Sequence, residues 1–255
     1  MSFEACAALV ERGDPDRFRA AMAAPVEARK ILFPLYAFNV EVTRAPWVTQ
    51  ESMIAEMRLQ WWRDALEEIG QGGPVRKHEV VDELAKILDM DACKSLNALI
   101  AARRWDIYTD PFEDEAHFDD YIHATSSNLM QVAANSLGAA DQKTLRYVGY
   151  ASGLANLFRA IPDLEQAGRK PLVDGRHIAV RTLAERGLEC LKRARSTKHM
   201  VAKAAAPALT TAFLARPTLL QAMKTPERVA AGELGLGPAR ESLRFANVSL
   251  RGWWR

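Results

Sequence analysis

The spacing of apolar residues predicts helices along most of the chain. On either side of Pro46, two series recur at the interval of one helical face: Ile31, Leu35, Phe38 and Val42 before it, and Ile54, Met57, Trp61, Ala65 and Ile69 after it. The same spacing predicts helices over residues 3–11, 16–22, 79–88, 92–108, 118–137, 144–161, 180–195, 200–215, 218–223 and 238–250. No run of alternating apolar residues predicts a strand, so we expect an all-α fold.

Prolines set several of the expected helix boundaries. Pro34 lies inside its helical pattern and should kink or divide it, because proline lacks the backbone N–H. Pro162 should end the helix that begins at residue 144, and Pro207 should kink the helix over 200–215. No repeat, low-complexity block or long linker divides the chain. We therefore expect residues 1–255 to form a single-domain helical bundle.

Composition and charge exclude one class of partner. The 255 residues are 49% hydrophobic, enough for a sizeable core, and 34 Lys and Arg nearly balance 32 Asp and Glu. No run of basic residues reaches five, and no basic stripe alternates with aromatic residues. Nucleic-acid binding is therefore not expected.

Cysteine and histidine usage predicts neither a disulfide framework nor a metal site. Cys6, Cys93 and Cys190 are odd in number and far apart, which is typical of reduced thiols, and the histidines are scattered. No stretch of about eighteen apolar residues predicts a transmembrane helix. The N-terminus lacks the apolar segment of a signal peptide. We expect a soluble, cytoplasmic protein, peripheral to the inner membrane if it handles a lipid.

Polar residues within the apolar helices are the candidates for a lined cavity. They are Arg29, Tyr36, Glu41, Gln60, Arg63, Asn156 and Arg159. Each also has a purely structural interpretation: Arg63 can pair with Glu67 on its own helix, and Arg159 can stabilise a helix C-terminus. The residue types alone do not decide between lining a cavity and supporting the fold.

Two sequence motifs resemble the squalene/phytoene synthase family. They are Leu35-Tyr36-Ala37-Phe38 and Arg58-Leu59-Gln60-Trp61-Trp62-Arg63. Tyr121 to Gly138 and Gly168 to Leu172 are similar to later segments of the family. The resemblance implies a helical bundle of the isoprenoid-synthase type with a central cavity.

The resemblance also locates the family's metal site. The family binds magnesium through four aspartates, and the magnesium neutralises a leaving diphosphate. At the corresponding positions this chain has Thr43, Trp47, Ala160 and Leu164, while Asn156 and Arg159 of the second motif are retained. We therefore expect no cofactor and no metal ligand at these positions.

A relocated acid is the alternative. Asp163 and Glu165 flank Leu164, but a shift of one residue turns a side chain by about 100° around a helix. Past Pro162 the chain need not be helical, which leaves Asp163 open as a ligand. Asp106 and Asp110 form an i, i+4 pair that we interpret as solvated. If any of these acids held magnesium, the chain could be an active prenyl transferase. No Ser-His-Asp or Cys-His arrangement supports other chemistry.

One branch of the family is similar to this chain in lacking the metal-binding aspartates. The phytoene-synthase-like mitochondrial complex I assembly factors have an Ala-Phe-Asn-Val-Glu helix, as in residues 37–41, and a second motif similar to residues 158–162. The resemblance implies a non-catalytic role, either in respiratory-complex assembly or in binding an isoprenoid or lipid. In the second case the retained arginines would bind an anionic head group without magnesium.

The C-terminus offers a possible membrane contact. Trp253, Trp254 and Arg255 have the composition of an interfacial anchor. The other interpretation is that both tryptophans fold back into the bundle.

Overall fold

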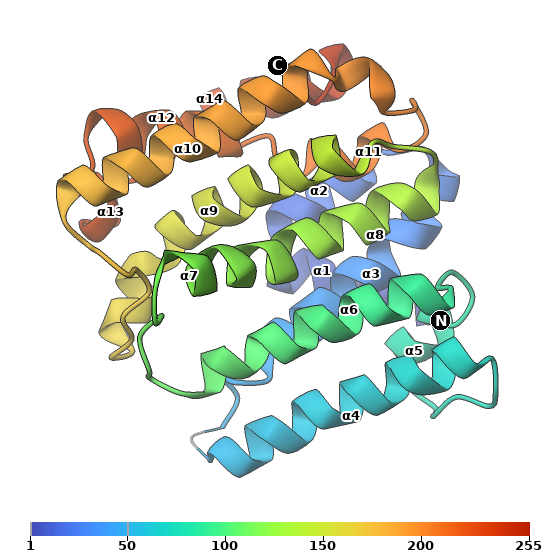
Figure 1. Cartoon of the computed structure of the whole chain (residues 1–255). Coiled ribbons are helices and arrows are strands. Elements are labelled where there is room, and N and C mark those ends of the chain that lie inside the picture. Colours follow the sequence, from blue (N-terminus) through green and yellow to red (C-terminus); the bar gives the residue numbers. More distant parts are fainter. Residues whose placement is uncertain (1, 50) are drawn as a thin grey trace.

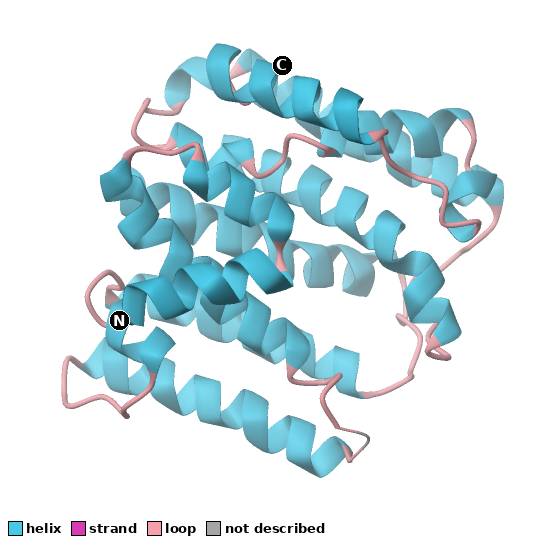
Figure 2. Cartoon of the chain, turned by 180° about the vertical axis from the view of Figure 1, so that it is seen from behind, coloured by secondary structure: helices cyan, strands magenta, loops and turns pink. Residues whose placement is uncertain are grey.

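The computed structural model describes residues 2–49 and 51–255 and is built of helices (Figure 1, Figure 2). Its α-helices are α1 (Ser2–Gly13), α2 (Pro15–Met22), α3 (Val26–Arg44), α4 (Ser52–Gln71), α5 (Glu79–Leu84), α6 (Met90–Arg103), α7 (Glu115–Ile122), α8 (Asn128–Leu137), α9 (Gln142–Gln166), α10 (His177–Ser196), α11 (Ala206–Thr210), α12 (Ala215–Lys224), α13 (Glu227–Ala230) and α14 (Pro238–Arg251). Shorter turns are η1 (Arg104–Ile107), the π-helical η2 (His123–Ser127) and η3 (Lys198–Met200). The described residues form no strand beyond one isolated bridge, Ala140 to Val201, so the all-α prediction is confirmed.

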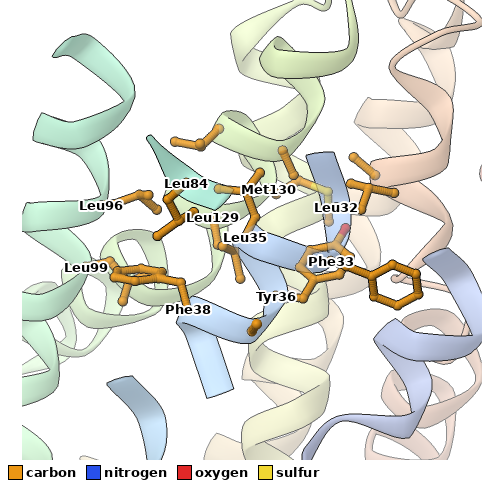
Figure 3. Close-up of a cluster of buried hydrophobic side chains, with 14 of the residues drawn as sticks. Leu32, Phe33, Leu35, Tyr36, Phe38, Leu84, Leu96, Leu99, Leu129 and Met130 are labelled. Atoms are coloured by element: carbon orange, nitrogen blue, oxygen red, sulfur yellow. The ribbon is translucent and has the colours of Figure 1, made fainter. Parts of the chain in front are cut away.

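Helix α3 lies inside the bundle, in contact with α1, α2, α5 and α8. Its middle is apolar on all sides and buried, as a helix surrounded by others requires. Figure 3 shows its side chains Leu32, Leu35 and Phe38 among leucines of α5, α6 and α8. A second cluster of buried side chains joins α9 to α7, α10 and α12. Helix α4 lies at one edge of the bundle and packs mainly on α6 (Figure 1).

Pro34 and Pro162 lie inside continuous helices. Pro34 therefore does not divide its helix, and the predicted helix end at Pro162 is wrong. Helix α3 runs through Pro34, which is buried, and α9 runs through Pro162 as far as Gln166. A proline removes one backbone hydrogen bond, whereas burial of Phe33 and Ile161 on the same turns stabilises the helix. The helix that we expected to end at residue 161 therefore continues past the second family motif.

The helix predicted over residues 200–215 is wrong. The residues between η3 and α11 are not helical, and α11 begins only at Ala206. Pro207 therefore sits in the first turn of α11, where its missing N–H costs nothing. Residues before it bond to the turn after α8 instead, with Ala202 N donating to Ala139 O at 2.9 Å. The predicted helix over 118–137 exists, but it contains the π-helical turn η2.

Candidate functional site

Tyr36 of α3 is the centre of the candidate site. Its side chain is 2% exposed and lies under the guanidinium of Arg17, 5.7 Å from the ring centre. Arg17 forms an ion pair with Asp14, the residue that caps α2. Burial raises the pKa of Tyr36 well above its usual range, so the phenol is neutral at ordinary pH. The arrangement holds a neutral hydroxyl next to a compensated cation.

The hollow beside Tyr36 is very small. It encloses about 10 Å³ and is lined by Arg17, Tyr36, Ser126, Leu129, Met130, Ser152, Ala208 and Thr211. That is about the space that one water molecule needs. Figure 3 shows Leu129 and Met130 of α8 close to Leu35 and Tyr36 of α3. In place of the cavity that the resemblance implied, the interior at this point is packed with side chains.

The three candidate arginines each bond elsewhere. Nε of Arg29 donates to the carbonyl of Ala24 at 2.9 Å. Nε of Arg63 donates to Oδ1 of Asn97 on α6 at 2.8 Å, and not to Glu67 as its structural interpretation predicted. Nη1 of Arg159 lies 2.9 Å from Oδ2 of Asp16 on α2. Arg159 is also not at a helix end, because α9 continues to Gln166.

The remaining candidates do not meet Tyr36 either. Gln60 is exposed, and its amide donates to Asp64 on the next turn of α4 at 2.7 Å. Asn156 is exposed on α9, and Glu41 is half-buried near the end of α3. Of the candidate residues only Tyr36 borders the small hollow. The candidate residues, which the sequence suggested as the lining of one cavity, therefore lie apart in the structure.

The four positions that the resemblance assigns to the family's metal ligands hold no suitable ligand set. Thr43 is half-buried, and its hydroxyl and the amide oxygen of Asn39 one turn earlier are buried without a hydrogen-bond partner. Trp47 is 45% exposed, and Ala160 and Leu164 are half-buried. Within residues 2–49 and 51–255, no group of three His, Cys, Asp or Glu side chains is placed to hold a metal ion. These residues do not fit magnesium.

The acids beside the second motif point away from it. Because α9 stays helical beyond Pro162, Asn156, Ala160 and Leu164 share one face. Asp163 and Glu165 are rotated from that face by about 100° each way. Both are exposed. The structure therefore gives no support to Asp163 as a substitute ligand.

Asp106 is buried, contrary to our prediction that it is solvated. Asp106 lies in η1, and the residue is 4% exposed. Arg103 donates to Oδ2 at 2.9 Å, and the hydroxyl of Tyr121 donates to Oδ1 at 2.8 Å. Arg103 also donates to the Tyr121 oxygen at 2.7 Å, and burial raises the pKa of Tyr121. Asp110, its expected partner, is exposed.

Arg169, after the end of α9, is a buried residue that sequence reasoning passed over. Its guanidinium donates to the carbonyl of Tyr108 at 2.6 Å and to that of Asp106. The same group lies over the indole of Trp47, 4.5 Å from the ring centre. It therefore ties the segment after α9 to η1 and to the turn after α3. The signal in the sequence was the family-like Gly168-Arg169 pair.

A larger hollow opens elsewhere, between α7, α10 and the segment before α10. It encloses about 290 Å³, and its lining includes Phe118, Ile178, Leu183 and Arg186. Arg186 is already paired with Asp119, at 2.9 Å. The hollow contains none of the candidate residues from either family motif.

The C-terminal tryptophans fold back onto the bundle. Trp253 is 8% exposed and belongs to the main core, and Nζ of Lys198 lies 4.6 Å from the ring centre of Trp254. The alternative that we had left open, an interfacial anchor at the tail, does not agree with this packing.

Comparison with known proteins defines the class. Residues 10–172 match the sequence model of the squalene/phytoene synthase family, which is more than half of the chain. The chain belongs to the squalene/phytoene synthase family, as its motifs predicted. Among solved structures, a dehydrosqualene synthase in complex with ligand superposes with a TM-score of 0.81 over 98% of this chain and 96% of that chain, at 13% identity. The squalene synthase HpnC from Alicyclobacillus acidocaldarius gives 0.71 over 89% of this chain and 94% of that chain, at 16% identity. At such identities the likeness shows the fold alone.

Curated relatives come from the branch that the sequence resembled. An NADH dehydrogenase (ubiquinone) complex I assembly factor 6 homolog of Drosophila melanogaster is 31% identical over 167 residues, covering 62% of this chain and 50% of that protein. The NADH dehydrogenase (ubiquinone) complex I assembly factor 6 of Homo sapiens is 24% identical over 161 residues, covering 62% of this chain and 48% of that protein. The chain thus spans about half the length of the curated relatives that it matches.

Proposed function

We propose that this chain is a non-catalytic member of the squalene/phytoene synthase family that assists the assembly of a respiratory complex by binding protein. The observation that carries the proposal is the packed interior beside Tyr36, where the hollow encloses about 10 Å³. Small-molecule sites in proteins enclose roughly 300 to 1,000 Å³. An isoprenoid diphosphate does not fit into this space, which supports a role other than condensing two of them.

The residues at the family's metal positions support the same proposal. A methyl group at Ala160 and an isobutyl group at Leu164 cannot coordinate a hard cation, which requires oxygen ligands. The retained Arg159 is bound to Asp16 at 2.9 Å, so its charge is already compensated. The positive cavity that we inferred from the retained arginines therefore has no counterpart around Tyr36.

The names of the relatives indicate the kind of partner. They are assembly factors of NADH dehydrogenase (ubiquinone) complex I. For this chain, a protein of that complex or of a similar respiratory complex is the proposed partner. The expected localisation of this chain, in the cytoplasm and peripheral to the inner membrane, is part of the same proposal.

An active prenyl transferase remains the alternative, but the site has few acidic side chains that could bind magnesium for it. Asp163 and Glu165 are exposed, and Asp106 is held by Arg103 and Tyr121. A binding role for an isoprenoid or lipid would need the packed interior to open. Isothermal titration with a prenyl diphosphate in EDTA measures this directly, and we expect no heat of binding.

Removal of the chain from the cells that make it tests the proposed function. We expect less fully assembled NADH dehydrogenase on a native gel stained for its activity, and recovery when the chain is restored. The matched variant Asn156→Ala/Arg159→Ala changes the retained residues of the second motif, both exposed on α9. It should restore assembly as well as the unchanged chain does. Normal assembly without the chain would contradict the proposal.

A further inference from the structure

The outer side of α14 has an apolar stripe beside a basic stripe. Residues three and four apart share one side of a helix. The apolar stripe consists of Ala239, Leu243, Ala246 and Leu250, all of which are exposed. The basic stripe lies about 100° further around the helix and consists of Arg240, Arg244, Asn247 and Arg251. We call the two stripes together the α14 surface. Leu243 and Leu250 are 70% and 86% exposed, so the apolar stripe is open to water.

The opposite side of α14 attaches the helix to the bundle. Val248 is buried, and the ring of Phe245 packs edge-on against that of Phe213, with the ring centres 5.1 Å apart. Glu241, the one acidic residue of α14, pairs with Arg19 of α2. The leucines of the outer side take no part in this attachment. They are therefore available for a contact that leaves the fold unchanged.

Basic residues outnumber acidic ones over the whole neighbourhood of α14. From the start of α11 to the last residue, the basic residues are Arg216, Lys224, Arg228, Arg240, Arg244, Arg251 and Arg255, and the acidic ones are Glu227, Glu233 and Glu241. Two of these acids are already paired, Glu241 with Arg19 and Glu233 with Arg228. The acids at α2, the helix that Glu241 reaches, are also paired: Asp14 with Arg17 and Asp16 with Arg159. The positive excess thus remains after every pair is set aside.

The basic residues of this neighbourhood also lie close to one another. Nε of Arg244 donates to the carbonyl of Phe213 at 3.0 Å, and a second nitrogen of the same guanidinium donates to the carbonyl of Arg255. Burial, followed by the charge of Arg216, lowers the pKa of Arg244. Arg216, Arg244 and Arg255 therefore add to one positive surface, and an anionic surface complements it.

We propose that the α14 surface docks on an anionic lipid bilayer. An amphipathic helix can lie in the plane of a membrane, with its apolar side chains between the head groups and its arginines on the phosphates. The two stripes run along the same helix at the outer edge of the bundle, so both can meet a flat surface at once (Figure 1, Figure 2). The tail tryptophans take no part, because Trp253 belongs to the core.

A bilayer fits the α14 surface better than an acidic protein does. The leucines project into water, and neither hollow of the molecule that we describe is lined by α14. Protein interfaces pack aromatic and arginine anchors into pockets, whereas head groups yield to projecting side chains. Within the described ranges no helix is long and apolar enough to cross a membrane, and the proposal concerns the outer side of one helix. The inference deepens the localisation in the proposed function and rests on it, but vesicle binding needs no respiratory complex and is tested separately.

Sedimentation of the purified chain with lipid vesicles tests the docking surface. The vesicles contain equimolar phosphatidylcholine and phosphatidylglycerol, with pure phosphatidylcholine as the neutral arm. We expect binding to the anionic vesicles alone, weakening as salt is added. The variant Arg240→Gln/Arg251→Gln should bind them about tenfold more weakly, because it removes two charges from the membrane surface. The matched control Lys77→Gln/Lys170→Gln changes the net charge equally at two other exposed positions and should bind within about twofold of the unchanged chain.

A second pair of variants tests the apolar stripe. Leu243→Gln/Leu250→Gln should also bind about tenfold more weakly, because it replaces the two side chains that enter the bilayer. Its control is Met53→Gln/Met57→Gln on α4, where the methionines are 74% and 66% exposed. Circular dichroism of all four variants confirms that they are folded. The proposal requires loss in both α14 variants and in neither control, and any other pattern overturns it. Absence of binding by the unchanged chain would also overturn it and would leave the α14 surface to an acidic protein.

Discussion

The guanidinium of Arg169 lies 4.5 Å from the ring centre of Trp47, a residue that the resemblance places at one of the family's metal-binding positions. The same guanidinium donates to the carbonyls of Tyr108 and Asp106. The side chain of Arg169 thus ties the segment after α9 to η1 and to the turn after α3. The arrangement is structural, and it leads to the first prediction.

Arg169→Ala should lower the free energy of unfolding by about 2 to 4 kcal/mol, because it leaves two carbonyl groups without their charged donor. Urea unfolding followed by circular dichroism measures the change. The control is Arg176→Ala, whose side chain is 81% exposed and paired with Asp174. We expect no measurable change there. Equal stability of the two variants would show that Arg169 does not hold this region together.

Asp106 and Asp110 should differ sharply although they are one helical turn apart in sequence. Asp106→Asn leaves the buried charge of Arg103 without its partner, which costs about 3 to 5 kcal/mol of unfolding free energy. Asp110→Asn changes an exposed side chain and should leave stability unaltered. Thermal unfolding of both variants distinguishes these outcomes. A small effect of Asp106→Asn would mean that the Arg103–Asp106–Tyr121 group is open to water.

The sequence predicted the fold better than the site. Apolar spacing located α3, α4 and α9. On α4 it indicated the wrong face in part, because Ile54 and Met57 of the predicted series are exposed while Leu59 and Leu66 are buried. It did not show that α9 continues past Pro162, since burial of Ile161 stabilises that turn from outside the local sequence. The burial of Asp106 depends in the same way on Tyr121, which approaches from α7. Contacts between distant segments decided each of these differences.

The dispersal of the candidate residues has the same cause. Helical spacing places Arg63 on a face of α4, but only the position of Asn97 on α6 shows where its guanidinium bonds. Arg17, which covers Tyr36, had no signal of its own in the sequence. Sequence reasoning located the helices that surround the site, and packing determined which side chains meet there.

Gly149→Ala should destabilise the protein although alanine favours helices. A Cβ at this position would lie 2.5 Å from Cα of Ser127, in the backbone of η2. The helical preference of alanine offsets only about 1 kcal/mol, whereas overpacking against a rigid backbone costs about 1 to 3 kcal/mol. Gly73→Ala is the control, because its Cβ would meet nothing within 4 Å. A stabilised Gly149→Ala variant would show that η2 can move away from α9.

His123 should make stability depend on pH. Burial, followed by the charge of Arg146, lowers the pKa of His123 below its ordinary value. Nε of Arg146 donates to Nε2 of His123 at 3.3 Å, so Nε2 is unprotonated and Nδ1–H faces Oγ of Ser127 at 3.1 Å. Asp119 and Asp120 oppose the shift without reversing it, and Arg186 adds to it. The folded protein therefore favours the neutral ring.

The sign of the pH effect follows from this lowered pKa. The unfolded chain takes up a proton near pH 6.5, about the ordinary pKa of histidine, before the folded chain does. The stabilisation is thus complete above about pH 6.5 and is lost as the pH falls towards the folded pKa. Urea unfolding at a series of pH values should show this loss, and His123→Gln should reduce the slope. An unchanged slope in the variant would assign the pH dependence to other groups.

The central claim is that the chain is not a prenyl transferase, and an assay for condensation tests it most directly. The purified chain is incubated with farnesyl or geranylgeranyl diphosphate and magnesium, with an active dehydrosqualene synthase as the positive control, and the extracted lipids are separated by chromatography. The account predicts no condensation product above the blank without protein, because the hollow beside Tyr36 encloses about 10 Å³ and Ala160 and Leu164 cannot hold magnesium. A magnesium-dependent product formed by the unchanged chain would contradict it.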